Sequence, residues 1–275
     1  MNPNSIVLAS TWNPRGEIDR FERILKRLEK TYERIYISLP AQPDDPAGQT
    51  ALLERLAGSS VSCYINHDWS WGRYMALKLA SQSASPWIHY ADMDRLLRWI
   101  EQRPEEWLET LPVIQTCDYL VIGRTTQAYQ THPAALVQTE ALSNAVISHI
   151  VGKQMDVSAG SKGFSLAAAR YVVEHTTPGH ALGTDGEWTV LLKHAGFKIS
   201  YIEVDGLDWE SADRYQANAA DALRQQQAAA AYDADPANWA RRTAVAAEII
   251  RVGLATAGRQ ETVETRSRRN PEEWL

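Results

Sequence analysis

Residues 71–95 read WGRYMALKLASQSASPWIHYADMDR, and this stretch indicates the fold most clearly. Its first half has the small and apolar spacing of a helix, from about Trp71 to Ser81. Its second half is an apolar run that ends in two carboxylates, Asp92 and Asp94. Two acids at i and i+2 beyond a strand end can both reach one hard cation, and oxygen ligands suit Mg²⁺ or Mn²⁺. A solvated turn rich in Asp is the simpler alternative.

Similar helix and strand units continue on both sides of this stretch. The apolar runs that predict strands are SIVL at 5–8, RIYISLP at 34–40, VSCYIN at 61–66, DYLVIGR at 118–124 and FKISYIEVD at 197–205. Helical patterns separate several of these runs, such as the apolar stripe that begins at Ile18. Strands that alternate with helices predict a doubly wound, mostly parallel α/β sheet with helices on both faces. Ligands of such sheets bind at the carboxyl ends of the strands.

The sequence changes character after Trp209, where Ala, Gln, Arg and Glu dominate with helical periodicity. We therefore predict a catalytic and binding domain over residues 1–208 and a C-terminal helical extension over 209–275. Ala246, Ile249, Ile250 and Leu254 form one apolar stripe in this extension. The stripe predicts that the extension packs on the core rather than folding as an independent domain.

Composition excludes several classes of protein. The 275 residues carry a net charge of −6, so there is no basic field of the kind that drives nucleic-acid binding. No run approaches the ~18 apolar residues of a membrane span, so no integral membrane segment is expected. The two cysteines, Cys63 and Cys117, lie in separate apolar segments, which favours free thiols in a reducing compartment. We expect a cytoplasmic protein, and the sequence leaves its oligomeric state open.

Three segments, taken in order, resemble the family 2-type glycosyltransferases of the GT-A fold. The segment that leads into the first Asp pair matches at Gly72, Arg73, Ala76, Leu77, Ala80, Asp92 and Asp94. Further on, VSAGSKGFSLAAARYV at 157–172 resembles the acceptor-side segment of that family, and GTDGEWTV at 183–190 resembles its acidic segment. The resemblance spans residues 5–205 and lies in the order and spacing of loose motifs.

This resemblance implies a hexosyltransferase-type enzyme that moves a sugar from a nucleotide-diphosphate sugar to an acceptor that the sequence does not identify. It implies a Mn²⁺ or Mg²⁺ cofactor bound by the DxD acids, Asp92 and Asp94, with His180 as a third ligand. It leaves open whether the reaction inverts or retains the anomeric configuration, and for an inverting reaction it makes Asp185 the catalytic base, fixed at a helix start. Because Thr184 replaces the first acid of the family's pair, Glu187 is a competing candidate for the base.

The donor contacts come from the same loops. Ser10, Thr11 and Trp12 follow the first strand, where hydroxyls and a ring can hold a nucleobase and ribose, although a packed turn is an equal alternative. We place Met93, between the two acids, in the same donor site. Arg73 lies near a helix start and is either an anion-binding or a solvent-facing residue. Lys162 faces a diphosphate or anionic acceptor, or is a plain loop lysine, because the Walker spacing is absent.

Four of the ten tryptophans fall in or beside these loops, namely Trp69, Trp71, Trp188 and Trp209. Aromatic faces stack well on sugar rings, so one or two of the four are candidates for an acceptor platform, and core packing is expected for the rest.

Two other functions share part of this pattern. A sugar nucleotidyltransferase has a similar architecture but expects a Gly-rich, basic loop after the first strand, whereas STWNPRG at 10–16 supplies one Gly and one Arg. A noncatalytic nucleotide-sugar-binding protein needs no set of acids, which disfavours it. A phosphatase of the haloacid dehalogenase type is disfavoured because Arg95 and Leu96 follow Asp94 and three strand–helix units come first.

Overall fold

A seven-stranded sheet forms the centre of the computed structural model, which describes residues 5–268 and their side chains to residue 259. The strand order is β3-β2-β1-β4-β6-β5-β7, and β6 is antiparallel to both of its neighbours, while the other pairs are parallel. The strands are β1 Ile6–Thr11, β2 Ile35–Pro40, β3 Val61–Asn66, β4 Trp87–Asp92, β5 Tyr119–Arg124, β6 Ser161–Ser165 and β7 Ile199–Val204. The predicted mostly parallel α/β sheet is confirmed.

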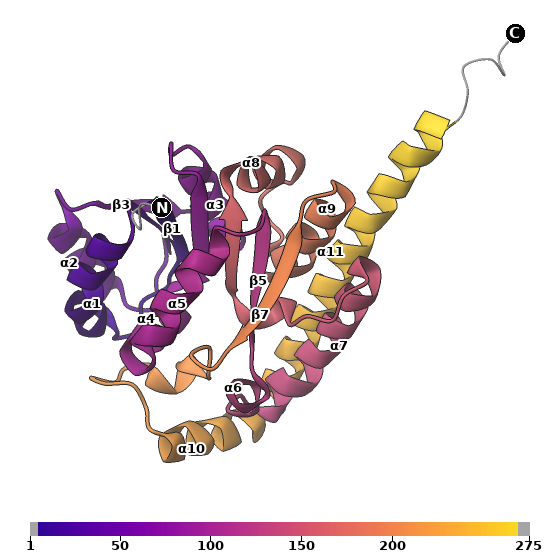
Figure 1. Cartoon of the computed structure of the whole chain (residues 1–275). Coiled ribbons are helices and arrows are strands. Elements are labelled where there is room, and N and C mark those ends of the chain that lie inside the picture. Colours follow the sequence, from indigo (N-terminus) through magenta and orange to yellow (C-terminus); the bar gives the residue numbers. More distant parts are fainter. Residues whose placement is uncertain (1–4, 269–275) are drawn as a thin grey trace, which may run out of the picture.

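Helices cover both faces of this sheet (Figure 1). One face packs against α1 Ile18–Thr31, α2 Pro46–Leu56, α4 Met93–Gln102 and α5 Pro104–Ile114. The other face packs against α3 Gly72–Ser81, α7 Ala134–Val151, α8 Leu166–His175, α9 Thr184–His194 and the long α11 Pro236–Arg268. Shorter elements are α6 Thr126–Gln130, α10 Ala222–Asp233, η1 Trp69–Trp71, η2 Val157–Ala159, η3 Ala181–Gly183 and η4 Glu210–Asp213.

Strand β1 shows how the alternation of side chains builds two cores. Ile6 and Leu8 pack into the core on the α1 side, while Val7 and Ala9 pack into the core on the α3 side. All four side chains are at most 1% exposed, as expected for a central parallel strand that is covered on both faces. Within residues 5–268, no helix is both long enough and apolar enough to cross a membrane.

The C-terminal extension packs on the core through α11, which lies against α7, α9 and η3 and runs past them at one end (Figure 1). Two glycines allow this close approach. A Cβ on Gly186 would lie 2.6 Å from the Ile249 carbonyl oxygen, and one on Gly253 would lie 2.4 Å from Ile147 Cδ1. Leu254, which we placed on the packed stripe, is instead 52% exposed. The predicted boundary at residue 208 stays a prediction, and residues 1–4 and 269–275 lie outside the described residues.

A histidine is enclosed in the middle of the sheet. His89 of β4 is fully buried, with Nδ1 2.6 Å from the Tyr32 hydroxyl and Nε2 3.1 Å from Ser161 Oγ. Burial lowers the pKa of His89 to about 3. The folded protein therefore keeps this imidazole neutral at pH values at which the unfolded chain, with an ordinary pKa near 6.5, already binds a proton.

We expect His89 to make the protein acid-labile. The stability that the neutral ring contributes is present above pH 6.5 and is lost as the pH falls toward 3, by roughly 2 kcal/mol between pH 7 and pH 5. Urea unfolding at the two pH values measures this loss. His89→Gln should lose less stability than the wild type over that interval, and the exposed His67→Gln should match the wild type. Equal losses in all three proteins would contradict the assignment.

Candidate functional site

A cavity of about 380 Å³ opens where the carboxyl ends of four parallel strands meet. Its lining includes Thr11 from β1, Pro40 from β2, Asn66 from β3 and Asp92 from β4. From β1 the chain builds β2 and β3 on one side and then places β4 on the other, so the cavity lies at the switch point of the sheet. Open α/β sheets bind ligands at this point.

The residues at the ends of β1 and β2 add apolar surface to the cavity. Trp12 lines it together with Leu39 and Pro40, and Asn13 and Arg15 add polar groups. The Trp12 ring is 3% exposed and packs on Phe21 with ring centroids 5.0 Å apart, so a large part of it serves the core. Trp12 therefore packs in the core and also lines the cavity, and its contact with a nucleobase stays a prediction.

Ser10 and Met93 lie elsewhere. The Ser10 side chain is fully buried and its hydroxyl donates to the Ala91 carbonyl at 2.7 Å, which ties β1 to β4. Met93 is fully buried in the core on the α1 side. Neither is among the described residues that line the cavity. Met93 points away because it starts α4, where successive residues turn by about a quarter of a circle.

Arg73, Asp92 and Asp185 line the cavity and form a charged cluster, the floor cluster, with Lys162, which lies behind Asp185 and is not among the described lining residues. Arg73 Nη2 lies 2.6 Å from Asp92 Oδ2, and Arg73 Nη1 lies 2.8 Å from Asp185 Oδ2. Lys162 Nζ donates to Asp185 Oδ1 at 2.5 Å. Arg73 is 6% exposed and Lys162 is 1% exposed, so the solvent-facing and loop alternatives for these two residues were wrong. Lys162 lies on β6, a strand that the apolar pattern of the sequence did not predict.

The charges of this cluster support one another. Burial alone would raise the pKa of Asp185, but Arg73 and Lys162 outweigh it and hold that pKa below its ordinary value. Burial lowers the pKa of Lys162, and the nearby Asp185 offsets this only in part. Burial also opposes the charged form of Arg73, yet Asp185 and Asp92 raise its pKa well above the usual range. Asp185 is therefore ionised, with both oxygens paired to cations.

Two further acids that line the cavity, Asp94 and Glu210, have fewer cationic partners than Asp185. Asp94 Oδ1 accepts from the Arg95 backbone N–H at 2.9 Å, in the first turn of α4. Burial, together with the charges of Glu210 and Asp92, raises the pKa of Asp94 to about 7. Glu210 is 7% exposed and lines the same cavity. Its Oε2 accepts no hydrogen bond from the described residues, and Arg95 Nε lies 3.7 Å away.

Glu210 is held by a rigid segment that the sequence did not reveal. It begins η4, whose Asp213 is 2% exposed and pairs with two arginines. Arg20 Nη2 lies 2.9 Å from Asp213 Oδ2, and Arg98 Nη1 lies 2.8 Å from Asp213 Oδ1. The sequence did contain one signal for Glu210: it is an acid that follows the last strand, β7, on the side where the parallel strands end.

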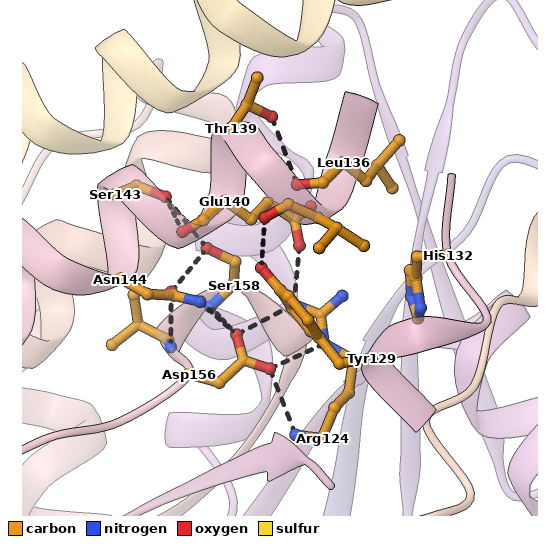
Figure 2. Close-up of polar contacts among 12 residues, drawn as sticks. Arg124, Tyr129, His132, Leu136, Thr139, Glu140, Ser143, Asn144, Asp156 and Ser158 are labelled. Carbon is orange, nitrogen blue, oxygen red and sulfur yellow. Dashed lines mark hydrogen bonds and ion pairs between the residues drawn. The ribbon is translucent and has the colours of Figure 1, made fainter. Parts of the chain in front are cut away.

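A second buried network supports the wall formed by α7 and α11, and Figure 2 shows its centre. Arg124 binds Asp156 with Nε 2.7 Å from Oδ2, and its Nη2 donates to Glu140 Oε2 at 2.7 Å. The guanidinium carbon lies 4.3 Å from the centre of the Tyr129 ring. Arg242 of α11 binds the other oxygen of Glu140, so both Glu140 and Arg242 reach the cavity lining with their charges paired.

His180 and Glu187 pair with each other. His180 Nδ1 lies 2.9 Å from Glu187 Oε2, and Glu187 is fully buried beneath η3 and α11. The assignment of His180 as a metal ligand beside Asp92 and Asp94 is therefore not supported by this geometry. Among the side chains that the structure describes, those of residues 5–259, no three from His, Cys, Asp or Glu are grouped closely enough to hold a metal ion. The sequence pattern did not predict the pairing of His180 with Glu187, because a pattern does not show which way each loop side chain points.

The chain was compared with protein-family models, curated proteins and solved structures. No protein-family model and no curated protein matches the chain. Among solved structures, a mannosyltransferase, PcManGT from Pyrobaculum calidifontis in complex with GDP-Man and Mn²⁺, aligns with 98% of this chain and 84% of its own chain. The TM-score is 0.39 and the identity is 10%. At this level of similarity the comparison assigns no residue and no substrate to this chain.

Proposed function

We propose that this protein is a glycosyltransferase that uses a nucleotide-diphosphate sugar. The observation that carries the proposal is the 380 Å³ cavity, which lies at the switch point of the sheet and combines apolar side chains after β1 and β2 with buried acids. Small-molecule sites of this size are typically concave, with a few fixed polar groups. The nucleoside fits beside Thr11 and Trp12, and the diphosphate fits toward the N-terminus of α4, where the helix dipole favours negative charge.

The acids at the α4 end fit a divalent cation. Asp94 and Glu210 offer hard oxygen donors, and Glu210 Oε2 is buried without a hydrogen bond from the described residues. Magnesium and manganese sites often use one or two carboxylates and complete their coordination with substrate phosphates, so a third protein ligand is not required. When bound there, the cation supplies positive charge that neutralises the diphosphate leaving group. Asp92 lies beside this pair but has Oδ2 engaged by Arg73 and Oδ1 by the Tyr90 hydroxyl.

Asp185 is our candidate for the carboxylate that takes the proton from the acceptor hydroxyl. It lines the cavity and is held ionised, whereas Glu187 binds His180 and is absent from the described lining. A pKa held low makes Asp185 a weaker base. We therefore infer that the acceptor must displace one of the cations before Asp185 can accept the proton.

We expect nucleoside diphosphate binding to require a divalent cation. Calorimetry with UDP, GDP and ADP should give binding in Mn²⁺ and little in EDTA, because Asp94 and Glu210 repel a bare diphosphate. Asp94→Asn and Glu210→Gln should each weaken binding in Mn²⁺ on the order of tenfold or more. The exposed Glu203→Gln on β7 serves as the matched control. Equal affinity with and without the cation would rule out this use of the acids.

The products that the protein releases distinguish this transferase from the two alternative functions. A sugar nucleotidyltransferase would release pyrophosphate from a nucleoside triphosphate and a sugar 1-phosphate, which the transferase proposed here does not do. A noncatalytic nucleotide-sugar-binding protein would bind the donor and release no nucleoside diphosphate under any acceptor condition.

A further inference from the structure

Of the four tryptophans that the sequence places in or beside the site loops, two are buried and two are exposed. Trp188 is 1% exposed and Trp209 is 3% exposed, and both pack in hydrophobic clusters. Trp69 and Trp71 remain 71% and 41% exposed. An indole is the largest apolar side chain, and exposing it forgoes a substantial gain from burial. Trp69 is largely exposed to solvent and also lines the cavity.

Trp69 is held in place by its short helix, η1. Asp68 Oδ1 accepts from the Ser70 backbone N–H at 2.9 Å and from the Ser70 hydroxyl at 2.7 Å. The Trp71 backbone N–H donates to the Asp68 carbonyl at 3.1 Å, and η1 packs against η3. The Trp69 ring is therefore carried by an ordered turn.

Helix η3 packs against both η1 and α11, and these elements form an apolar wall of the cavity beside Trp69. Leu182 of η3 and Val245 and Ile249 of α11 also line the cavity. This wall is separate in sequence from the apolar residues Trp12, Leu39 and Pro40. Because η3 leads directly into α9, the wall adjoins Asp185. A ligand held against it would therefore lie near the floor cluster.

We infer that Trp69 is the stacking platform for a carbohydrate acceptor, an inference that rests on the proposed transferase function. A sugar ring presents C–H groups on its faces and hydroxyls around its edge. The C–H face suits the electron-rich face of an exposed indole, and the hydroxyls suit the acids and arginines on the rest of the lining. A purely apolar acceptor would exclude water from these charged groups and offer them no hydrogen bonds in return, which is costly. The mixed lining therefore favours a glycan acceptor.

The test uses the labelled full-length chain on an array of immobilised oligosaccharides, with Mn²⁺ and each of UDP, GDP and ADP. We expect Trp69→Ala to lose at least tenfold of the oligosaccharide signal and Trp69→Phe to keep most of it. Trp239→Ala is the matched control, because this half-buried tryptophan donates to the Asp233 carbonyl and is not among the described lining residues. Calorimetry of nucleotide binding runs in parallel on every variant.

A loss of oligosaccharide binding that exceeds any loss of nucleotide affinity by fivefold or more in Trp69→Ala supports the inference. The inference is overturned if the wild type binds nucleotide but no oligosaccharide, if Trp69→Ala binds oligosaccharides normally, or if it loses nucleotide affinity instead. If the wild type binds no nucleotide, the proposed donor site is overturned. The comparison of oligosaccharide binding between the wild type and Trp69→Ala then still tests the role of Trp69.

Discussion

Asp185→Asn is expected to lower the free energy of unfolding by about 3–5 kcal/mol and to slow sugar transfer on the order of 100-fold or more. From the sequence alone we would expect little change in melting temperature, because Asp185 reads as a helix cap that Asn replaces well. The structure contradicts that expectation. The N-cap position of α9 is Gly183, without a side-chain cap, and Asp185 lies buried between Arg73 and Lys162.

The stability effect and the effect on transfer can be separated by a second substitution. In Asp185→Asn two buried cations face a single acid, Asp92, whereas adding Lys162→Met removes one of these cations and restores the balance of charge. The double variant should regain a large part of the lost stability, measured by urea unfolding, while sugar transfer should stay slower than in the wild type on the order of 100-fold or more. Glu187→Gln is the comparison for the competing base. An Asp185→Asn protein that transfers sugar at a near-normal rate, beside an inactive Glu187→Gln, would reverse the assignment.

A chain that ends at Asp208 is expected to lose cooperative folding altogether. The truncation removes the buried Ile249 and Val252 of α11, each worth roughly 1.5–3 kcal/mol of burial. It also removes Asp213 from Arg20 and Arg98, which then keep only Glu101 and Asp208, respectively, as carboxylate partners. Together these losses are comparable to the whole stability of a typical domain. Calorimetric unfolding of the truncated chain measures the result.

Point variants of the full chain test the same claim without truncation. Ile249→Ala, at a side chain that is 1% exposed, should cost about 2–5 kcal/mol. Leu254→Ala lies on the same helix at a side chain that is 52% exposed and should cost less than about 1 kcal/mol. If the truncated chain melts as the full chain does, and the two point variants are equal, the extension is dispensable.

The sheet was accessible from the sequence because its evidence is local. The apolar run before Asp92 and the helical spacing from Trp71 each occupy a few consecutive residues, and their alternation indicates parallel strands. Strand β6 was not accessible in this way. Its five residues, SKGFS, contain one large apolar side chain, and only pairing with β4 and β5 makes them a strand.

The site was only partly accessible, because the partners of its charges are far apart in the chain. Thr11, Trp12, Arg73, Asp92, Asp94 and Asp185 are brought to one cavity, as their positions after strands and at helix starts suggested. The pairing of Lys162 with Asp185 depends on the insertion of β6. The contributions of Glu210 and Arg242 depend on how the C-terminal extension folds back. No local pattern encodes such contacts.

The most direct test of the donor site is a thermal-shift screen of the full-length protein with UDP-, GDP- and ADP-sugars, each in Mn²⁺ and in EDTA. A ligand at 100 times its dissociation constant adds about 2.7 kcal/mol to the folded state. For a chain of this size, this corresponds to a rise in melting temperature of roughly 5–10 °C. The account predicts such a rise with at least one donor in Mn²⁺ and its loss in EDTA. No rise with any donor, or an equal rise in EDTA, would contradict it.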